Sequence, residues 1–121
     1  MTKSTNIVPE DFVDIFNAVK RAWRADTSAS SDSAPDCMEL GQCAVTALLV
    51  QYGYGGVLKR ALVNGTSHYW NEIDGQVIDL TRAQFDEPLT IVDEQERERA
   101  YVLSFPATAE RYEILKDRVR L

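Results

Sequence analysis

The sequence predicts a single α+β domain spanning residues 1–121, in which a central buried helix packs on a small antiparallel meander flanked by N- and C-terminal helices. Three observations predict it: an amphipathic helical pattern near the N-terminus, an almost unbroken apolar run in the middle, and two hairpin dipeptides soon after that run. A chain of 121 residues is long enough for one hydrophobic core but not for two.

The first predicted element is an amphipathic helix over roughly residues 9–24. Pro9 suits a helix start, and acidic residues follow it in the first turn. The apolar residues that recur at helical spacing are Phe12, Ile15, Phe16, Val19 and Trp23. The next segment, ADTSASSDSAPD over residues 25–36, is small and polar, which is typical of a flexible loop or lid.

The segment GQCAVTALLVQYGYGG, residues 41–56, predicts a helix over 43–52 with Gly53 as its C-cap. Apolar residues lie nearly all round this helix, which indicates that it is buried. The GYGG sequence at 53–56 follows a helix and precedes a strand, the reverse of a phosphate-binding loop. We therefore interpret it as a turn.

Residues 57–81 predict a three-stranded antiparallel meander, because Asn64-Gly65 and Asp74-Gly75 are two-residue hairpin signals. The pairs that the second turn predicts are Ile73–Gln76, Glu72–Val77, Asn71–Ile78 and Trp70–Asp79. The last block is charged and ends in a predicted helix near 107–119. We expect this block, the segment DEQERERA included, to form a solvated outer layer.

Composition narrows the class of protein. Hydrophobic residues at 45% and charged residues at 26% are ordinary for a soluble globular domain. A net charge of −6 argues against nucleic acid or an anionic membrane as the main partner, since both require clustered Lys and Arg. The N-terminus lacks the apolar core of a signal peptide, and no stretch approaches the length of a membrane span. We therefore expect a cytoplasmic protein whose two cysteines are reduced.

Cys43, at the first position of the central helix, is the first candidate for chemistry. A helix N-terminus presents unsatisfied N–H groups and a partial positive charge, which favour a thiolate and can bind an oxyanion. Gly41 allows a close approach of the chain just before this cysteine, and Gln42 offers a side-chain donor. Position alone fits an inert buried cysteine equally well, because free cysteines are often buried.

His68, the single histidine of the chain, is the candidate base, and Asp79 is its candidate partner. With a two-residue turn between their strands, Asp79 lies on the same face as His68 and diagonally adjacent to it. Asp79 stands between two apolar residues, where a buried carboxylate must be hydrogen-bonded, and orienting a histidine would satisfy it. The alternatives are a structural or solvated His68 and an exposed strand position for Asp79.

The predicted strands have two different faces. The more apolar face carries Tyr69, Ile73, Ile78 and Leu80, and the mixed face carries His68, Trp70, Glu72, Val77 and Asp79. A catalytic site requires the central helix to start beside the mixed face, which leaves the apolar face for the terminal helices. Trp70, next to His68 on the mixed face, either walls a pocket or fills the core.

The order of a cysteine at a helix start, a histidine on a strand and an aspartate on the next strand resembles the papain-like superfamily in its transglutaminase and arylamine N-acetyltransferase branch. Over roughly residues 41–85, GQCAVTALLVQ, HYWN and IDLTRAQF resemble the YunG-like family of small uncharacterised bacterial proteins. The resemblance implies a papain-like cysteine-hydrolase core with Cys43 as nucleophile, His68 as base and Asp79 as orienting acid. Papain-type proteases place an oxyanion glutamine six residues before the nucleophile, where this chain has Cys37.

The expected function is that of a thiol-dependent hydrolase or acyltransferase, which attacks an amide or ester carbonyl and forms a thioester. Its expected substrate is a small molecule or a protein side chain that carries such a group. The expected catalytic residues are Cys43, His68 and Asp79, and the expected oxyanion or substrate-binding residues are Gln42, Gly41 and Trp70. The alternative is a catalytically silent binding or inhibitory module of the same fold, whose acidic surface docks a basic protein partner.

We expect neither a cofactor nor a metal ion. Cys37, Cys43 and His68 are too few for a zinc site, and their spacing matches no common zinc motif. Cys37 is open to two other interpretations: a disulfide with Cys43, or a resolving thiol for an oxidised Cys43.

Overall fold

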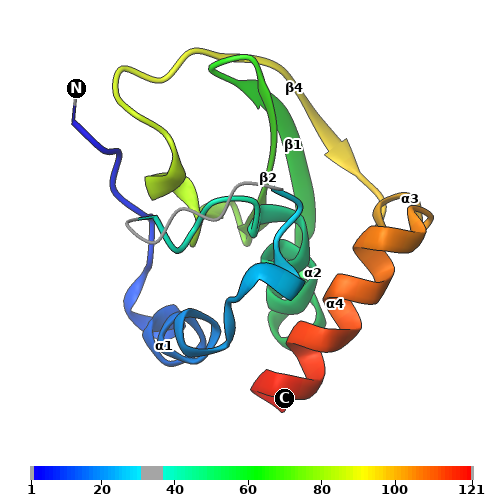
Figure 1. Cartoon of the computed structure of the whole chain (residues 1–121). Helices are drawn as coiled ribbons and strands as arrows, with labels where there is room; N and C mark the ends of the chain where they lie inside the picture. The colour runs from blue at the N-terminus through cyan, green and yellow to red at the C-terminus, as the bar shows by residue number, and fades with distance from the viewer. Residues whose placement is uncertain (1, 31–36, 121) are drawn as a thin grey trace.

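The computed structural model describes residues 2–30 and 37–120, which form an α+β domain with one four-stranded antiparallel sheet (Figure 1). The strands are β1 (Val57–Val63), β2 (Thr66–Ile73), β3 (Gln76–Ile78) and β4 (Ile91–Arg97), in the order β3-β2-β1-β4. The first three form the predicted meander, and β4 joins it at the free edge of β1.

The longer helices are α1 (Val13–Ala22), α2 (Cys43–Tyr54) and α4 (Pro106–Val119). Shorter elements are η1 (Glu10–Phe12), η2 (Ala25–Thr27), η3 (Arg82–Gln84) and α3 (Arg99–Leu103). The three predicted helices are therefore confirmed, and in Figure 1 α2 lies between α1 and α4. None of the helices that the structure describes combines the length and the apolar character that a bilayer crossing requires.

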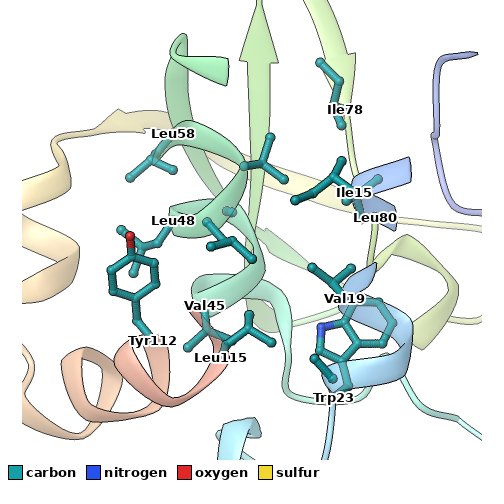
Figure 2. Packing of buried hydrophobic residues seen from close by; sticks show 14 of the residues in the cluster. Ile15, Val19, Trp23, Val45, Leu48, Leu58, Ile78, Leu80, Tyr112 and Leu115 are labelled. Carbon is teal, nitrogen blue, oxygen red and sulfur yellow. The ribbon is translucent and has the colours of Figure 1, made fainter. Parts of the chain in front are cut away.

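Helix α2 lies at the centre of the core, as its apolar circumference predicts. Its most buried apolar side chains, each at most 2% exposed, are Val45, Ala47, Leu48, Leu49 and Val50. Figure 2 shows Val45 and Leu48 among side chains of α1, α4 and the sheet, including Ile15, Leu115 and Ile78. Full burial of an aliphatic side chain contributes about 1.5–3 kcal/mol, so this packing fixes the position of the helix.

The predicted end of this helix at Gly53 is wrong. Helix α2 continues through Gly53 to Tyr54, and Gly55 is its C-cap with φ 78°. A positive φ favours glycine at a helix end. Gly53 does not have a positive φ, whereas Gly55, the residue directly after the last helical residue, does.

Both hairpin turns are confirmed. The two residues of each dipeptide have positive φ, which is 50° and 81° at Asn64-Gly65 and 51° and 76° at Asp74-Gly75. Two positive values are what a type I′ turn requires, and this turn type matches the twist of antiparallel strands.

The register after the second turn is confirmed for three of the four predicted pairs, down to Asn71–Ile78. The predicted pair Trp70–Asp79 is wrong, because β3 ends at Ile78. Asp79 pairs instead with Ile7 of the N-terminal segment, through backbone N–H to O hydrogen bonds of 2.9 and 3.0 Å. The backbone that carries the candidate carboxylate is therefore held from its other side.

Strand β4 was not predicted. Its residues are exposed except for Arg97, so the segment is solvated as expected, but it pairs antiparallel with β1 over Leu58–Arg97 to Val63–Ile91. A 3.4 Å ion pair between Lys59 and Glu94 also joins the two strands. A strand that buries neither face has no apolar alternation, so its sequence contains no strand signal.

The predicted arrangement of the two sheet faces is wrong in part. Helix α2 covers the apolar face itself: Tyr69 and Ile73 pack against its core cluster, and the Asn71 amide donates a 2.9 Å hydrogen bond to the Ala47 carbonyl. The terminal helices complete this same core rather than having the apolar face to themselves. A helix that is apolar on all sides buries more apolar surface against the apolar face of the sheet than against the mixed face. This explains why α2 packs on the apolar face.

Candidate active site

His68 and Asp79 form a buried pair, as the strand geometry predicts. His68 is 2% exposed and Asp79 is 3% exposed, and the distance from Nε2 to Oδ2 is 2.7 Å. The other carboxylate oxygen of Asp79 accepts a 3.3 Å hydrogen bond from the Thr81 backbone N–H. An ionised carboxylate only accepts hydrogen bonds, so the hydrogen of this pair belongs to Nε2.

Cys43, partly exposed at the first position of α2, lies close enough to the His68 imidazole to help raise its pKa. Because Asp79 occupies Nε2, the nitrogen that remains for the thiol is Nδ1. Burial lowers the pKa of His68, but the hydrogen bonds and negative charges of Asp79 and Cys43 outweigh burial and raise that pKa to about 9. The structure thus brings the three predicted catalytic residues together.

Two aromatic rings fix the plane of the imidazole. Trp70 stacks on His68 with centroids 5.8 Å apart, and Phe85 meets it edge-on at 4.9 Å. Trp70, His68 and Asp79 also line a pocket of about 190 Å³. Its other lining residues are Val63, Glu72, Val77, Arg82, Phe85, Leu89, Ile91 and Glu94. Trp70 thus walls a pocket, and this pocket reaches the imidazole without including Cys43.

The start of α2 is held by the segment that follows α1. Gln42, expected to offer an oxyanion donor, is 3% exposed and directs its amide to that segment. Its Nε2 donates a 3.1 Å hydrogen bond to the Arg24 carbonyl, and its Oε1 accepts a 2.7 Å hydrogen bond from the Thr27 hydroxyl. Gln42 is the N-cap residue of α2 but forms no capping hydrogen bond with its side chain. The Gln42 amide therefore anchors the helix instead of facing the sulfur.

Gly41 makes the close approach that was predicted for it. Its φ is 75°, and a Cβ there would overlap the Ser28 hydroxyl and lie 2.7 Å from the Ser30 backbone N. The Gly41 carbonyl accepts a 2.9 Å hydrogen bond from the Ala29 N–H. Residues 28–30 of the predicted loop are therefore attached to the start of α2, and residues 31–36 lie outside the described part of the chain.

Gln84, at the end of η3, is a site residue that the sequence did not indicate. Its Nε2 lies 3.4 Å from His68 Nδ1 and donates a 3.1 Å hydrogen bond to the Thr81 carbonyl. Its Oε1 accepts a 3.4 Å hydrogen bond from the Gly41 N–H. A glutamine in a turn belongs to no periodic pattern, so the signal available was its place in the segment IDLTRAQF.

Cys37 lies near the same turn, with its sulfur 4.0 Å from the Ala83 carbonyl oxygen. Both cysteines are free thiols, so the disulfide interpretation is not what the structure shows. Over residues 2–30 and 37–120, no three His, Cys, Asp or Glu side chains are grouped as metal ligands would be.

The sequence profile of the family described as YunG protein matches residues 11–121. The chain belongs to the YunG family. A Bacillus subtilis (strain 168) protein named "Uncharacterized protein YunG" is 38% identical over 72 residues, which are 59% of this chain. The match spans 60% of the length of that YunG relative. No solved structure matches this YunG-family chain significantly, so the papain-like superfamily stays a prediction.

We expect Asp79→Asn to destabilise the fold more at pH 7 than at pH 10. The raised pKa of His68 means that the stability from its charge is complete below about 6.5 and is lost as pH rises through about 9. Breaking a buried charged pair lowers the free energy of unfolding by about 3–5 kcal/mol. Each unit by which Asp79 raises the pKa of His68 adds about 1.4 kcal/mol to this loss at pH 7, and nothing at pH 10, where His68 is neutral. Urea unfolding of both proteins at each pH measures the difference.

The control is the same substitution in a His68→Gln background, where the cost should not depend on pH. At each pH, the free energy of unfolding of the variant is subtracted from that of the wild type. Most of the contribution of Cys43 ionisation to stability then cancels. An equal cost of Asp79→Asn at pH 7 and pH 10 would contradict a charged His68.

Gly41→Ala should lower the free energy of unfolding by more than Gly65→Ala does. Both glycines have a positive φ, which costs an alanine about 1–2 kcal/mol. A Cβ at Gly65 meets nothing within 4 Å, whereas one at Gly41 overlaps the 28–30 segment. Thermal unfolding of the two variants isolates the cost of the overlap, and equal losses would show that the close approach is unimportant.

Proposed function

We propose that this protein is a thiol-dependent hydrolase or acyltransferase that acts on an amide or ester carbonyl. The observation that supports the proposal is the buried imidazole of His68, which the Asp79 carboxylate holds at Nε2 and whose pKa the nearby Cys43 side chain also helps to raise. Nucleophile, base and orienting acid are then in the order that thiol catalysis uses.

Below the raised pKa of His68, Nδ1 already holds the thiol proton, and in the first half-reaction the Cys43 thiolate forms a bond to the carbonyl carbon. The carbonyl oxygen becomes an oxyanion. As the tetrahedral intermediate collapses, the bond to the leaving nitrogen or oxygen breaks and the His68 proton passes to it. The product of this step is a thioester on Cys43.

In the second half-reaction, water or an amine attacks the thioester. His68 removes the proton of the attacking group, the carbon–sulfur bond breaks to release the thiolate, and the proton stays on His68. Hydrolysis, deamidation and acyl transfer share these steps and differ in the attacking and leaving groups. The two free thiols of the chain agree with a reducing compartment, and we place the reaction in the cytoplasm.

The start of α2 suits the oxyanion. The Gln42 side chain hydrogen-bonds with Arg24 and Thr27 and does not cap the helix. The first backbone N–H groups beside Cys43 therefore have no capping partner from Gln42. Such groups carry the positive end of the helix dipole. We infer from the same arrangement, a cysteine-bearing helix on an antiparallel sheet that carries the histidine, that the core is papain-like.

The pocket beside Trp70 favours a second candidate, a binding module without turnover. This pocket of about 190 Å³ lies against His68 but not against Cys43. The neighbouring strand β4 exposes the acidic residues Asp93, Glu94 and Glu96, which suit a basic partner. In this alternative the buried pair would be structural and Cys43 would be an ordinary thiol.

Alkylation of Cys43 by iodoacetamide as a function of pH separates the two candidates. A catalytic pair predicts labelling with a midpoint well below the ordinary thiol pKa of about 8.5, since the thiolate is the reactive form. At pH 7, His68→Ala should slow it by about ten-fold or more, as the thiolate fraction falls to that of an ordinary thiol. Peptide mass spectrometry gives the rate at each cysteine.

Cys37 is the internal reference, because it is partly exposed like Cys43 and its sulfur contacts a backbone carbonyl rather than an imidazole. Its rate should not respond to His68→Ala. A Cys43 midpoint near 8.5 that is the same in wild type and His68→Ala would exclude the catalytic pair and leave the binding module.

A further inference from the structure

The side-chain amide of Gln84 has a defined orientation. Its oxygen faces a donor, the Gly41 N–H at 3.4 Å, and its nitrogen faces an acceptor, the Thr81 carbonyl at 3.1 Å. Exchanging the two amide atoms would place oxygen against the Thr81 carbonyl oxygen and NH₂ against the Gly41 N–H, with the loss of both bonds. The nitrogen of Gln84 is therefore the atom that lies 3.4 Å from His68 Nδ1.

This contact depends on the protonation state of His68. With neutral His68, the proton lies on Nε2 against Asp79, and the one lone pair of Nδ1 faces the N–H of Gln84. Once Nδ1 has taken the thiol proton, it has no lone pair left, and the N–H of Gln84 loses this acceptor. A negative charge has then formed beside it, first on sulfur and next on the carbonyl oxygen of the substrate.

We propose that Gln84 is the side-chain donor of the oxyanion hole: while Nδ1 carries the thiol proton, the amide N–H of Gln84 has no acceptor there and binds the negative charge at Cys43. The proposal rests on the proposed function. The 3.4 Å contact of the Gln84 N–H with His68 Nδ1 is long, so a charged acceptor replaces it at little cost, while Oε1 keeps its hydrogen bond from the Gly41 N–H. Of the two glutamine amides beside the start of α2, Gln42 is committed to Arg24 and Thr27.

The test compares two reactions of the same sulfur. Alkylation by iodoacetamide is a displacement at a saturated carbon and forms no oxyanion, whereas acylation by p-nitrophenyl acetate forms one. Gln84→Met removes the donor at similar length. It should slow acylation by about 100-fold, the usual loss for one oxyanion donor, and leave the rate and pH profile of alkylation within about three-fold of wild type. Gln84→Glu should also slow acylation, because it places a negative charge near the oxyanion.

Gln42→Met is the matched control, because the Gln42 amide faces away from the Cys43 sulfur. This substitution should change acylation and alkylation in parallel. Equal loss of acylation and alkylation in Gln84→Met would make Gln84 a positioning residue and overturn the proposal, as would a variant with unchanged acylation. A wild type that is alkylated in a His68-dependent way but not acylated would overturn it too. Alkylation that is independent of His68 would instead overturn the proposed function.

Discussion

The hydrogen bond between His68 and Asp79 is the interaction on which the rest of the site depends. Both side chains are almost fully buried, so each needs the other: a lone buried carboxylate or imidazolium would cost several kcal/mol. The fold holds both ends. Strand β2 carries His68, two aromatic rings fix its plane, and the N-terminal segment pairs with the backbone of Asp79 through Ile7. The imidazole can then present one nitrogen, in one direction, to the start of α2.

The start of α2 is also held by several contacts. The turn after α1 binds Gln42, and the 28–30 segment leaves room at Gly41 for a glycine alone. These contacts place Cys43 where the helix dipole and the imidazole act on the same atom. The core supplies the rigidity, because α2 is buried on its sides and cannot shift without opening a cavity. The packing of α2 in the core therefore also determines where Cys43, its first residue, lies relative to His68.

Much of this could be predicted from local pattern. Helical periodicity predicted α1, and the Asp74-Gly75 dipeptide predicted the β2–β3 register, which ends at Ile78, one residue before the Asp79 that pairs with His68. Strand β4 could not be predicted, because a strand exposed on both faces has no alternation. The pairing of Asp79 with Ile7 could not either, since it joins segments 72 positions apart in an isolated bridge. The amide directions of Gln42 and Gln84 follow from tertiary neighbours, Arg24 for one and Gly41 for the other, which no spacing in the sequence reveals.

The single histidine of the chain allows the central claim to be measured directly. With ¹⁵N-labelled histidine, the ring nitrogens of His68 give one set of NMR signals, which report both the tautomer and the pKa. The account predicts a hydrogen on Nε2 throughout and a midpoint near 9 in the wild type, lowered in Cys43→Ser and in Asp79→Asn because each removes a negative partner. A midpoint near 6.5 that is the same in all three proteins would contradict it, since His68 would then be held by neither group.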